Sequence, residues 1–247
     1  MGKYYFLSDS HLGTDAVKNK RLHEQKLVCW LDMAQKDATE IFLVGDIFDF
    51  WFEYKSAVSK GFNRLLGKLC EITDRGVPVH FFIGNHDLWT FGYLADEIGL
   101  IVHKKPEIFT LNGKQIFIAH GDGLNDDNHS FKFARSLFHS KLMQRIFACI
   151  HPSIGLYVGQ KWSNHNRRKH DRQSTGFMGE DREPLVLFAK KFIRSQPMDF
   201  FIFGHRHILL NLQFAQSSRV IMLGDFIKEF SYAVLDENGV EIVSNGQ

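Results

Sequence analysis

Polar side chains that can bind metal ions follow five short apolar segments of this chain. They form the patterns D-x-H, G-D-x-x-D, G-N-H-D, H-G-D and G-H-x-H, and each pattern comes directly after an apolar run. One such pattern alone is a weak signal, but five in succession rarely arise by chance. The candidate ligands are Asp9, His11, Asp46, Asn85, His120, His205 and His207. This mixture of carboxylate, amide and imidazole donors suits Mn, Fe or Zn ions better than Mg or Ca ions, which prefer oxygen ligands alone.

The donor set predicts a site for two metal ions and a reaction at phosphorus. Two cations about 3.5–4 Å apart need a bridging ligand and can hold both the attacking and the leaving oxygen of an in-line displacement. Asp46 is the expected bridge, because it has two carboxylate oxygens and follows the turn at Gly45. The metal ions would also lower the pKa of a shared water, so that hydroxide is available near neutral pH.

The apolar segments are the expected β-strands that bring these side chains together. They cover residues 3–7, 40–44, 79–83, 115–119 and 199–203. Helical periodicity over about 18–36 and 58–74 separates the first three, which predicts an α/β fold with mostly parallel strands. In such sheets, ligands bind beyond the carboxyl ends of the strands. Asn112-Gly113 and residues 237–239 are typical of hairpin turns, so we expect antiparallel strands as well.

A basic, partly apolar stretch separates the fourth expected strand from the fifth. Residues 129–172 hold nine Lys or Arg and one Asp, a formal charge of +8, whereas the rest of the chain carries −6 and the whole chain +2. Apolar residues recur at helical spacing over 131–150, and Pro152 suits the first turn of a second helix. We interpret the stretch as a helical cap over the strand ends, within an insertion at about 125–182. The alternative is an ordinary helical excursion with a solvated basic face.

The length and composition are those of a single domain over residues 1–247. Hydrophobic residues make up 44% of the chain and 24 residues are Phe, which is ample for a buried core. Three widely spaced cysteines predict small buried side chains in a reducing compartment rather than disulfides. The N-terminal segment lacks the apolar region of a signal peptide, and no apolar run approaches the roughly 20 residues of a membrane span. We therefore expect a cytoplasmic protein.

In their order, the five patterns resemble those of the calcineurin-like metallophosphoesterases. The resemblance spans residues 9–207 and implies an α/β/β/α sandwich of two packed sheets. It implies that one metal ion is bound by Asp9, His11, Asp46 and His207, and the other by Asp46, Asn85, His120 and His205. His86 would then lie over the phosphate, where it stabilises charge or protonates the leaving oxygen. Asp49 could orient His86 as a carboxylate–histidine pair.

The stretch that includes the predicted cap resembles the UDP-2,3-diacylglucosamine diphosphatases of lipid A synthesis. The similarity lies in HGDGLNDDN at 120–128, in the basic helical insertion and in S-N-x-N-R at 163–167. It implies hydrolysis of a lipid-linked nucleotide, usually with manganese, and peripheral contact with the cytoplasmic face of the inner membrane. The substrate-binding residues that it implies are Asn85, His86, Asp127, Asn128, Ser163, Arg167 and Lys169. An acidic pyrophosphate and two acyl chains would suit the basic and apolar faces of the cap.

Three other functions are compatible with parts of the pattern. A metallophosphoesterase acting on another nucleotide or phosphodiester is the main alternative, because His86 stands where the best-known branch of the diphosphatases has arginine. A nuclease could use the +8 stretch against a phosphate backbone, but the apolar face of that stretch suits acyl chains, so we expect no nucleic-acid partner. A catalytically inactive binding scaffold would have lost ligands, and all seven candidate ligands are present.

Overall fold

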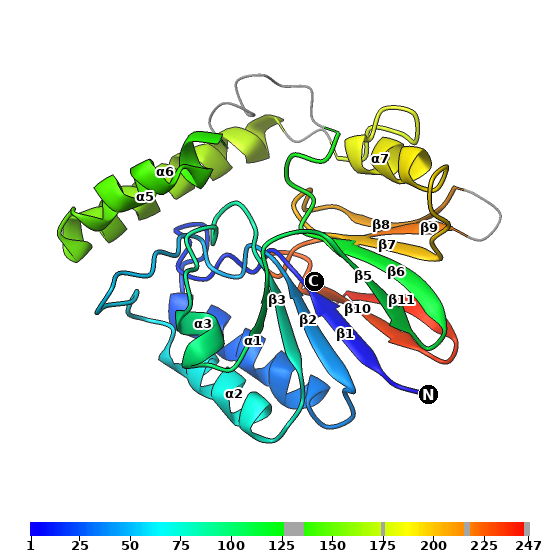
Figure 1. Cartoon of the computed structure of the whole chain (residues 1–247), viewed down its shortest axis with the longest axis horizontal. Coiled ribbons are helices and arrows are strands. Elements are labelled where there is room, and N and C mark those ends of the chain that lie inside the picture. The colour runs from blue at the N-terminus through cyan, green and yellow to red at the C-terminus, as the bar shows by residue number, and fades with distance from the viewer. Residues whose placement is uncertain (126–135, 174–175, 215–217, 245–247) are drawn as a thin grey trace.

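Two β-sheets packed face to face form the centre of the molecule, and helices cover their outer surfaces (Figure 1). The computed structural model describes residues 1–125, 136–173, 176–214 and 218–244, the side chains of 165–173 apart. The order of layers is helix, sheet, sheet, helix. This arrangement confirms the α/β/β/α sandwich that the sequence predicts.

The first sheet is built on parallel strands from the N-terminal part of the chain. Its strand order is β11 (Gly239–Ser244), β10 (Ser231–Asp236), β1 (Tyr4–Leu7), β2 (Glu40–Val44), β3 (Val79–Phe82) and β4 (Ile101–His103). Strands β1 to β4 run parallel, whereas β10 pairs antiparallel with β1 and with β11. Its outer face is covered by α1 (Lys20–Ala34), α2 (Asn63–Asp74) and the short α3 (Tyr93–Asp96).

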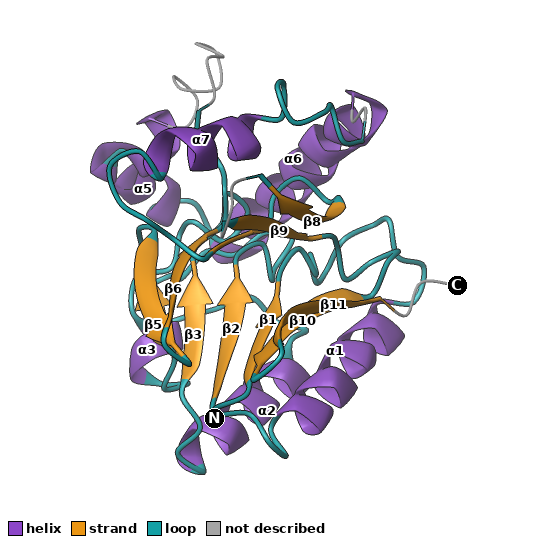
Figure 2. Ribbon diagram, turned by 90° about the vertical axis from the view of Figure 1, so that its right-hand side faces the viewer, coloured by secondary structure: helices purple, strands orange, loops and turns teal. Residues whose placement is uncertain are grey.

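The second sheet combines a hairpin with further parallel strands. Its strand order is β5 (Glu107–Leu111), β6 (Lys114–Ala119), β7 (Phe200–Phe203), β9 (Arg219–Leu223) and β8 (Leu209–Gln213). Strands β6, β7 and β9 are parallel, and α7 (Pro184–Phe192) covers their outer face (Figure 2). The hairpin β5–β6 turns at Asn112 and Gly113, whose φ angles of +49° and +76° are those of the expected two-residue turn.

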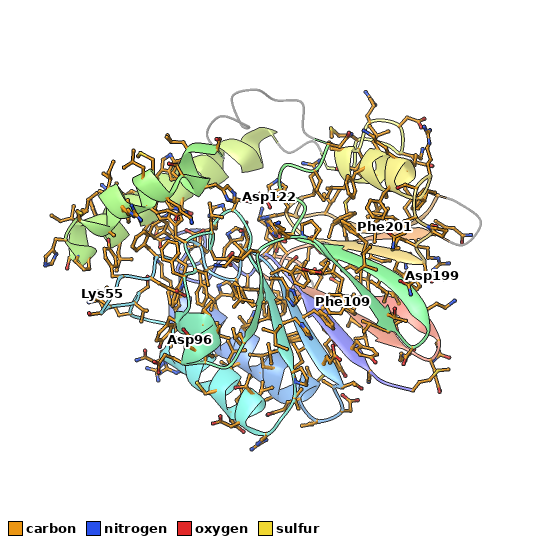
Figure 3. All side chains as sticks on the ribbon, viewed as in Figure 1. Lys55, Asp96, Phe109, Asp122, Asp199 and Phe201 are labelled. Carbon is orange, nitrogen blue, oxygen red and sulfur yellow. The ribbon has the colours of Figure 1, made fainter. Side chains whose placement is uncertain are left out.

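The alternating side chains of the strands make a core on each face of each sheet. Between the sheets, Phe6, Phe42 and Phe82 of the first sheet pack against Ile118 and Ile202 of the second. Phe109 of β5 lies between the sheets as well, edge-on to Phe42 (Figure 3). Separate apolar clusters lie under α1 and α2 and under α7. The strands are thus held from both sides, which gives their carboxyl ends a rigid base.

Two helices of the predicted insertion lie beyond the carboxyl ends of the first sheet. They are α5 (Lys141–Ala148) and α6 (Pro152–Gln173), and α6 begins at the expected proline. Phe147 of α5 packs on Phe52 and Trp89, and the Trp89 indole N–H donates a 2.9 Å hydrogen bond to the carbonyl of Phe138. The cap therefore rests on an aromatic cluster that belongs to the loops after β2 and β3.

Two local expectations differ from the structure. The second predicted helix begins at Asn63 rather than near residue 58. The helical periodicity over 131–150 is confirmed where the chain is described, by a short helical turn at 136–139 and by α5 from Lys141, while 131–135 lie outside the described residues. The cysteines are unpaired as expected, but Cys29 and Cys149 are exposed, because their positions fall on the solvent side of α1 and at the end of α5. A side chain on the solvent-facing side of a helix stays exposed even where its neighbours in sequence are apolar.

A buried carboxylate joins the two large helices of the first layer. Glu24 of α1 is 3% exposed and accepts hydrogen bonds from the backbone N–H groups of Arg64 (2.9 Å) and Leu65 (3.2 Å) at the start of α2. The Arg64 guanidinium lies 3.3 Å from the same carboxylate. A negative charge at a helix N-terminus satisfies otherwise unpaired N–H groups and interacts favourably with the helix dipole.

Candidate metal centre

All seven predicted ligands lie at carboxyl ends of parallel strands, in turns that the two sheets bring together. Asp9 and His11 follow β1, Asp46 follows β2 and Asn85 follows β3. From the second sheet, His120 follows β6, and both His205 and His207 follow β7. Figure 2 shows the arrowheads of β2 and β3 pointing toward the side on which the cap lies.

The ligand turns have an unusual backbone. Five ligands have positive φ angles: Asp9 (+53°), His11 (+42°), Asp46 (+53°), His205 (+67°) and His207 (+51°). This left-handed region is costly for residues with a Cβ and persists only where surrounding contacts hold it. Those contacts are hydrogen bonds between turns: the N–H of Asp9 donates to the carbonyl of Gly45 (3.1 Å), and that of His11 to the carbonyl of Asp46 (2.9 Å). Strain of this kind is typical of functional sites.

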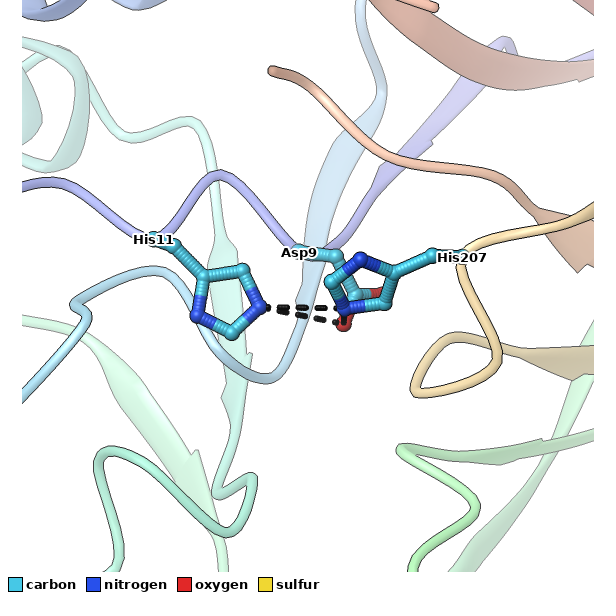
Figure 4. A group of neighbouring side chains, drawn as sticks. All are labelled: Asp9, His11 and His207. Carbon is cyan, nitrogen blue, oxygen red and sulfur yellow. Dashed lines mark hydrogen bonds and ion pairs between the residues drawn. The ribbon is translucent and has the colours of Figure 1, made fainter. Parts of the chain in front are cut away.

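The first ligand cluster consists of Asp9, His11 and His207, whose donor atoms lie within 4.8 Å of one another (Figure 4). Nε2 of His207 is 3.1 Å from Nε2 of His11 and 3.2 Å from Oδ1 of Asp9. That Oδ1 atom is buried and accepts no hydrogen bond from the described residues. A buried carboxylate oxygen without a donor, between two imidazole nitrogens, fits a divalent cation.

The second cluster consists of Asp46, His120 and His205, again with donor atoms within 4.8 Å of one another. Nε2 of His120 lies 3.3 Å from Oδ2 of Asp46 and 3.3 Å from Oδ1 of Asn85. The opposite nitrogen, Nδ1, donates to the carbonyl of Val44 at 2.9 Å. This backbone contact fixes the tautomer, so that the Nε2 lone pair faces the cluster.

Asp46 lies between the clusters, as its predicted bridging role requires. Its Oδ2 is 3.3 Å from Nε2 of His120 in one cluster and 3.7 Å from Nε2 of His11 in the other. Its Oδ1 accepts a 2.9 Å hydrogen bond from the N–H of His86. A third group of donor atoms within 4.8 Å of one another consists of His11, Asp46 and His86. The division of the ligands between two metal ions therefore stays a prediction. The described His and Asp side chains therefore form a site that fits divalent metal ions.

Two glycines of the sequence patterns allow the ligands to approach the backbone. A Cβ on Gly84 would lie 2.2 Å from Oδ1 of Asp46, and one on Gly204 would lie 2.6 Å from Oδ2 of Asp9. Neither position can hold a side chain without moving a candidate ligand. The glycines in G-N-H-D and G-H-x-H are thus part of the metal site, since only a hydrogen atom fits beneath each carboxylate.

Burial and mutual charge set the protonation states of the centre. Burial alone would raise the pKa of Asp46, but the neighbouring imidazoles, His120 first, hold it well below its usual range. Burial would lower the pKa of His11, yet the carboxylates of Asp49, Asp9 and Asp46 raise it to about 10. Burial and the charge of His120 lower the pKa of His205 to about 3. Cation binding must therefore displace a proton from His11, so affinity for metal should fall as pH falls.

His86 lies at the edge of the centre. Its Nδ1–H donates to the backbone carbonyl of Asp49 (2.8 Å), and its Nε2 is 3.9 Å from Oδ2 of Asp46. The Asp49 carboxylate lies elsewhere, 3.5 Å from Nδ1 of His11. We expected the Asp49 carboxylate to contact His86, but the contact is made by the main-chain carbonyl oxygen of Asp49. Its carboxylate instead faces a candidate ligand, because the turn after β2 directs the side chain inward.

The cap helix α6 contacts the edge of the centre at His86 directly. Ser163, predicted to bind substrate, is 4% exposed; its Oγ lies 2.7 Å from Nδ1 of His86, and its hydroxyl donates to the carbonyl of Asp49. Gln160 donates from Nε2 to the Asp49 carboxylate. Asn164 donates to the Asp15 carboxylate at 2.8 Å. Sequence analysis did not single out Gln160, and it included Asn164 only within the S-N-x-N-R motif. The spacing of Gln160, Ser163 and Asn164 at three and four residues was the available signal.

Asp87 is a further residue of the centre that sequence analysis did not single out. It is fully buried, and its carboxylate accepts hydrogen bonds from the N–H groups of Gly84 (2.6 Å) and Ile47 (2.9 Å), so that it joins the turns after β2 and β3. Burial and the nearby charge of Asp46 raise its pKa to about 7. Its position as the last residue of the G-N-H-D pattern could have identified it from the sequence.

The remaining predicted substrate residues cannot be compared with the centre. Asp127 and Asn128 lie outside the described residues. Arg167 and Lys169 belong to α6, which places their backbone in the cap, but their side chains are outside the described part of the chain. Their roles stay predictions.

The fold and the two ligand clusters define a metal-dependent phosphoesterase. A family model for the calcineurin-like phosphoesterases matches residues 2–209, and the chain belongs to this family. It is 38% identical to UDP-2,3-diacylglucosamine hydrolase from Porphyromonas gingivalis, over 95% of this chain and 94% of the relative. The enzyme of the same name from Haemophilus influenzae is 26% identical over 95% of each chain. A dimetal phosphatase from Danio rerio has the same fold, with a TM-score of 0.50 at 14% identity over 99% of this chain and 96% of that one.

Substitution of the bridging carboxylate should remove metal and activity together. Because Asp46 approaches both clusters, Asp46→Ala should release the bound divalent metal and reduce hydrolysis of bis(p-nitrophenyl) phosphate to background. Atomic emission spectroscopy after gel filtration and the diester assay measure the two effects. Asp37→Ala, at a carboxylate paired with Lys3 on the surface, is the matched control. Retention of a full metal complement by Asp46→Ala would contradict the assignment.

Substitution of His86 should separate chemistry from metal binding. His86→Ala should lower kcat by about 10²–10⁴-fold, the usual contribution of a general acid, with the metal content unchanged. His151→Ala, on the exposed surface of the cap, serves as control. The two arms are a steady-state diester assay and metal analysis of the same samples. Simultaneous loss of metal would show that His86 is a ligand, a role that its distance of 3.9 Å from Asp46 leaves within reach.

Proposed function

We propose that this chain hydrolyses the pyrophosphate of UDP-2,3-diacylglucosamine to UMP and 2,3-diacylglucosamine 1-phosphate, with two divalent cations that are manganese in the cell. The observation that carries the proposal is an apolar cavity built on the same helix that contacts the catalytic edge. The 38% identity to an enzyme named for this substrate, along almost the whole of both chains, supports the same reaction.

The cavity lies in the cap and has a volume of about 280 Å³. Its walls come from α5, α6 and the aromatic loops, with Phe50, Phe138, Ile146, Phe147 and Trp162 among them. Trp162 is the neighbour in sequence of Ser163, which contacts His86. A partly open, apolar cavity suits a hydrocarbon chain, since no polar group of a ligand would find a partner there. One helix thus contributes residues both to a place for an acyl chain and to the edge where a phosphate would bind.

The chain's own residues would bind, orient and protonate the substrate. Divalent cations at the two clusters would supply polarisation of the phosphate oxygens and a water of lowered pKa. The Asp49 carbonyl holds the proton of His86 on Nδ1, so Nε2 faces the centre. Burial lowers the pKa of His86, so Nε2 must first take up a proton before it can donate to a leaving phosphate oxygen, and the imidazolium so formed is a strong acid. Ser163 and Gln160 restrict the movement of this edge through Asp49.

We also propose that the cap contacts the cytoplasmic face of the inner membrane. Several apolar side chains of the cap are more than half exposed: Leu142 (66%), Ile146 (51%), Ile154 (57%), Tyr157 (59%) and Val158 (51%). Lys141, Arg145 and Lys161 lie on the same two helices. Apolar side chains beside cations suit the boundary of an anionic bilayer. No helix in the described ranges is long and apolar enough to cross a membrane.

The reaction is tested by release of UMP. Purified protein loaded with Mn²⁺ should form UMP from UDP-2,3-diacylglucosamine in detergent, at a rate at least about tenfold above that with UDP-N-acetylglucosamine, because only the lipid substrate fills the apolar cavity. Liquid chromatography of the nucleotide product measures both rates. If the protein cleaves bis(p-nitrophenyl) phosphate but forms no UMP from the lipid, the proposed substrate is wrong and another nucleotide or phosphodiester takes its place.

Membrane contact is tested by binding to vesicles. Leu142→Glu combined with Ile154→Glu should weaken co-sedimentation with phosphatidylglycerol-containing vesicles by about tenfold or more, because each buried side chain of this size contributes about 1.5–3 kcal/mol. Leu22→Glu on α1, at a residue that is 49% exposed, is the matched control on the far layer. Equal vesicle binding by the double variant and the wild type would exclude this face of the cap as the membrane-contacting surface.

A further inference from the structure

An arginine stands between the two histidines of the G-H-x-H pattern, and it pairs with a buried carboxylate. Nε of Arg206 donates to Oε1 of Glu183 at 2.8 Å, and Nη2 lies 3.4 Å from Oε2. The same Nη2 donates to the carbonyl of Gly176 at 3.3 Å. The guanidinium thus spans both carboxylate oxygens and one main-chain oxygen. This bidentate geometry fixes orientation as well as distance.

Glu183 ties this arginine to a different layer of the molecule. It is fully buried and lies directly before Pro184, the first residue of α7. Helix α7 packs its apolar face on β6 and β7 through Leu185, Val186 and Ala189. A buried carboxylate is costly without a partner, so the position of Glu183 in turn constrains the Arg206 side chain.

The turn that carries Arg206 needs such a constraint. His205 and His207, on either side of it, have φ angles of +67° and +51°, which residues with a Cβ rarely adopt. One side of the turn is held from within the centre, where the N–H of His205 donates to Oδ2 of Asp9 at 2.9 Å. The pair with Glu183 holds the turn from the outside. Strained backbone persists where contacts on several sides determine it.

We propose that Arg206 is a positioning residue for the metal centre, and that its pair with Glu183 holds His205 and His207 in the orientation that binds metal. The two histidines belong to different ligand clusters, so a single side chain between them acts on both. The inference rests on the metal centre of the proposed function and not on the lipid substrate. Groups that orient ligands from outside typically change metal affinity by about 10–100-fold.

Substitution with lysine tests orientation with charge retained. Lysine keeps the positive charge for Glu183 but has one nitrogen in place of the planar fork, so it cannot hold both carboxylate oxygens and the Gly176 carbonyl in the same way. Arg206→Lys and Glu183→Gln should each weaken Mn²⁺ binding by at least about tenfold, measured by isothermal titration calorimetry on the full chain. Electron paramagnetic resonance of the Mn²⁺-loaded protein should show a changed spectrum, which a purely structural pair would not cause.

The chain contains a matched control at the start of α2. Arg64 and Glu24 also pair an arginine with a buried carboxylate at a helix N-terminus, but they contact no candidate ligand among the described residues. Arg64→Lys and Glu24→Gln should leave Mn²⁺ affinity within twofold of wild type. In urea denaturation of the metal-free proteins, substitutions in either pair should lower the urea concentration at the midpoint of unfolding. Both pairs would then contribute to stability, but only the Arg206–Glu183 pair would contribute to Mn²⁺ affinity.

An unchanged Mn²⁺ affinity in Arg206→Lys, within twofold of wild type, would overturn the proposal and leave the pair a structural contact like the control. Should Arg206→Lys fail to fold, Arg206→Gln combined with Glu183→Gln replaces the ion pair by an amide pair and is subject to the same criterion. Failure of the proposed function has a different signature: wild-type protein would bind Mn²⁺ and cleave a model diester without forming UMP from the lipid.

Discussion

The structure depends on the burial of two carboxylates among imidazoles at the point where the two sheets meet. Asp9 and Asp46 are at most 2% exposed, and histidine nitrogens lie 3.2 Å from Oδ1 of Asp9 and 3.3 Å from Oδ2 of Asp46. Charges in such surroundings interact strongly and must be compensated nearby. Strained turns, glycines without room for a Cβ and hydrogen bonds between adjacent turns all follow from the need to bring these groups within reach of one another. The strands supply the rigidity that makes this possible.

The cap is connected to that centre through polar contacts rather than merely placed above it. Along α6, Gln160 and Ser163 contact Asp49 and His86, while Trp162 and Gly159 line the apolar cavity. The same helix therefore contributes both to the polar contacts at His86 and to the apolar cavity. Any ligand in that cavity and the position of His86 are thus set by one rigid element.

Much of the fold and most of the ligand set are predictable from the sequence, because both depend on local patterns. An Asp or His that follows a parallel strand lies at the carboxyl edge of the sheet. Because five strands are followed by such residues, the sequence identifies this edge as the site. Asn112-Gly113 identifies its hairpin because the turn needs two positive φ angles. The sequence does not reveal which way the side chain and the carbonyl of each turn residue point. The Asp49 carboxylate faces His11 and its carbonyl faces His86, a choice made by tertiary packing. The partnership of Arg206 with Glu183, 23 residues away, likewise depends on how α7 packs on the sheet.

The central claim is that these strand ends hold two divalent cations with Asp46 between them. Crystals grown with Mn²⁺, measured at the manganese absorption edge, test it most directly through the anomalous difference map. The account predicts two peaks about 3.5–4 Å apart, one beside Asp9, His11 and His207 and one beside Asn85, His120 and His205, each within bonding distance of Asp46. A single peak, or two peaks that do not share Asp46, would contradict it.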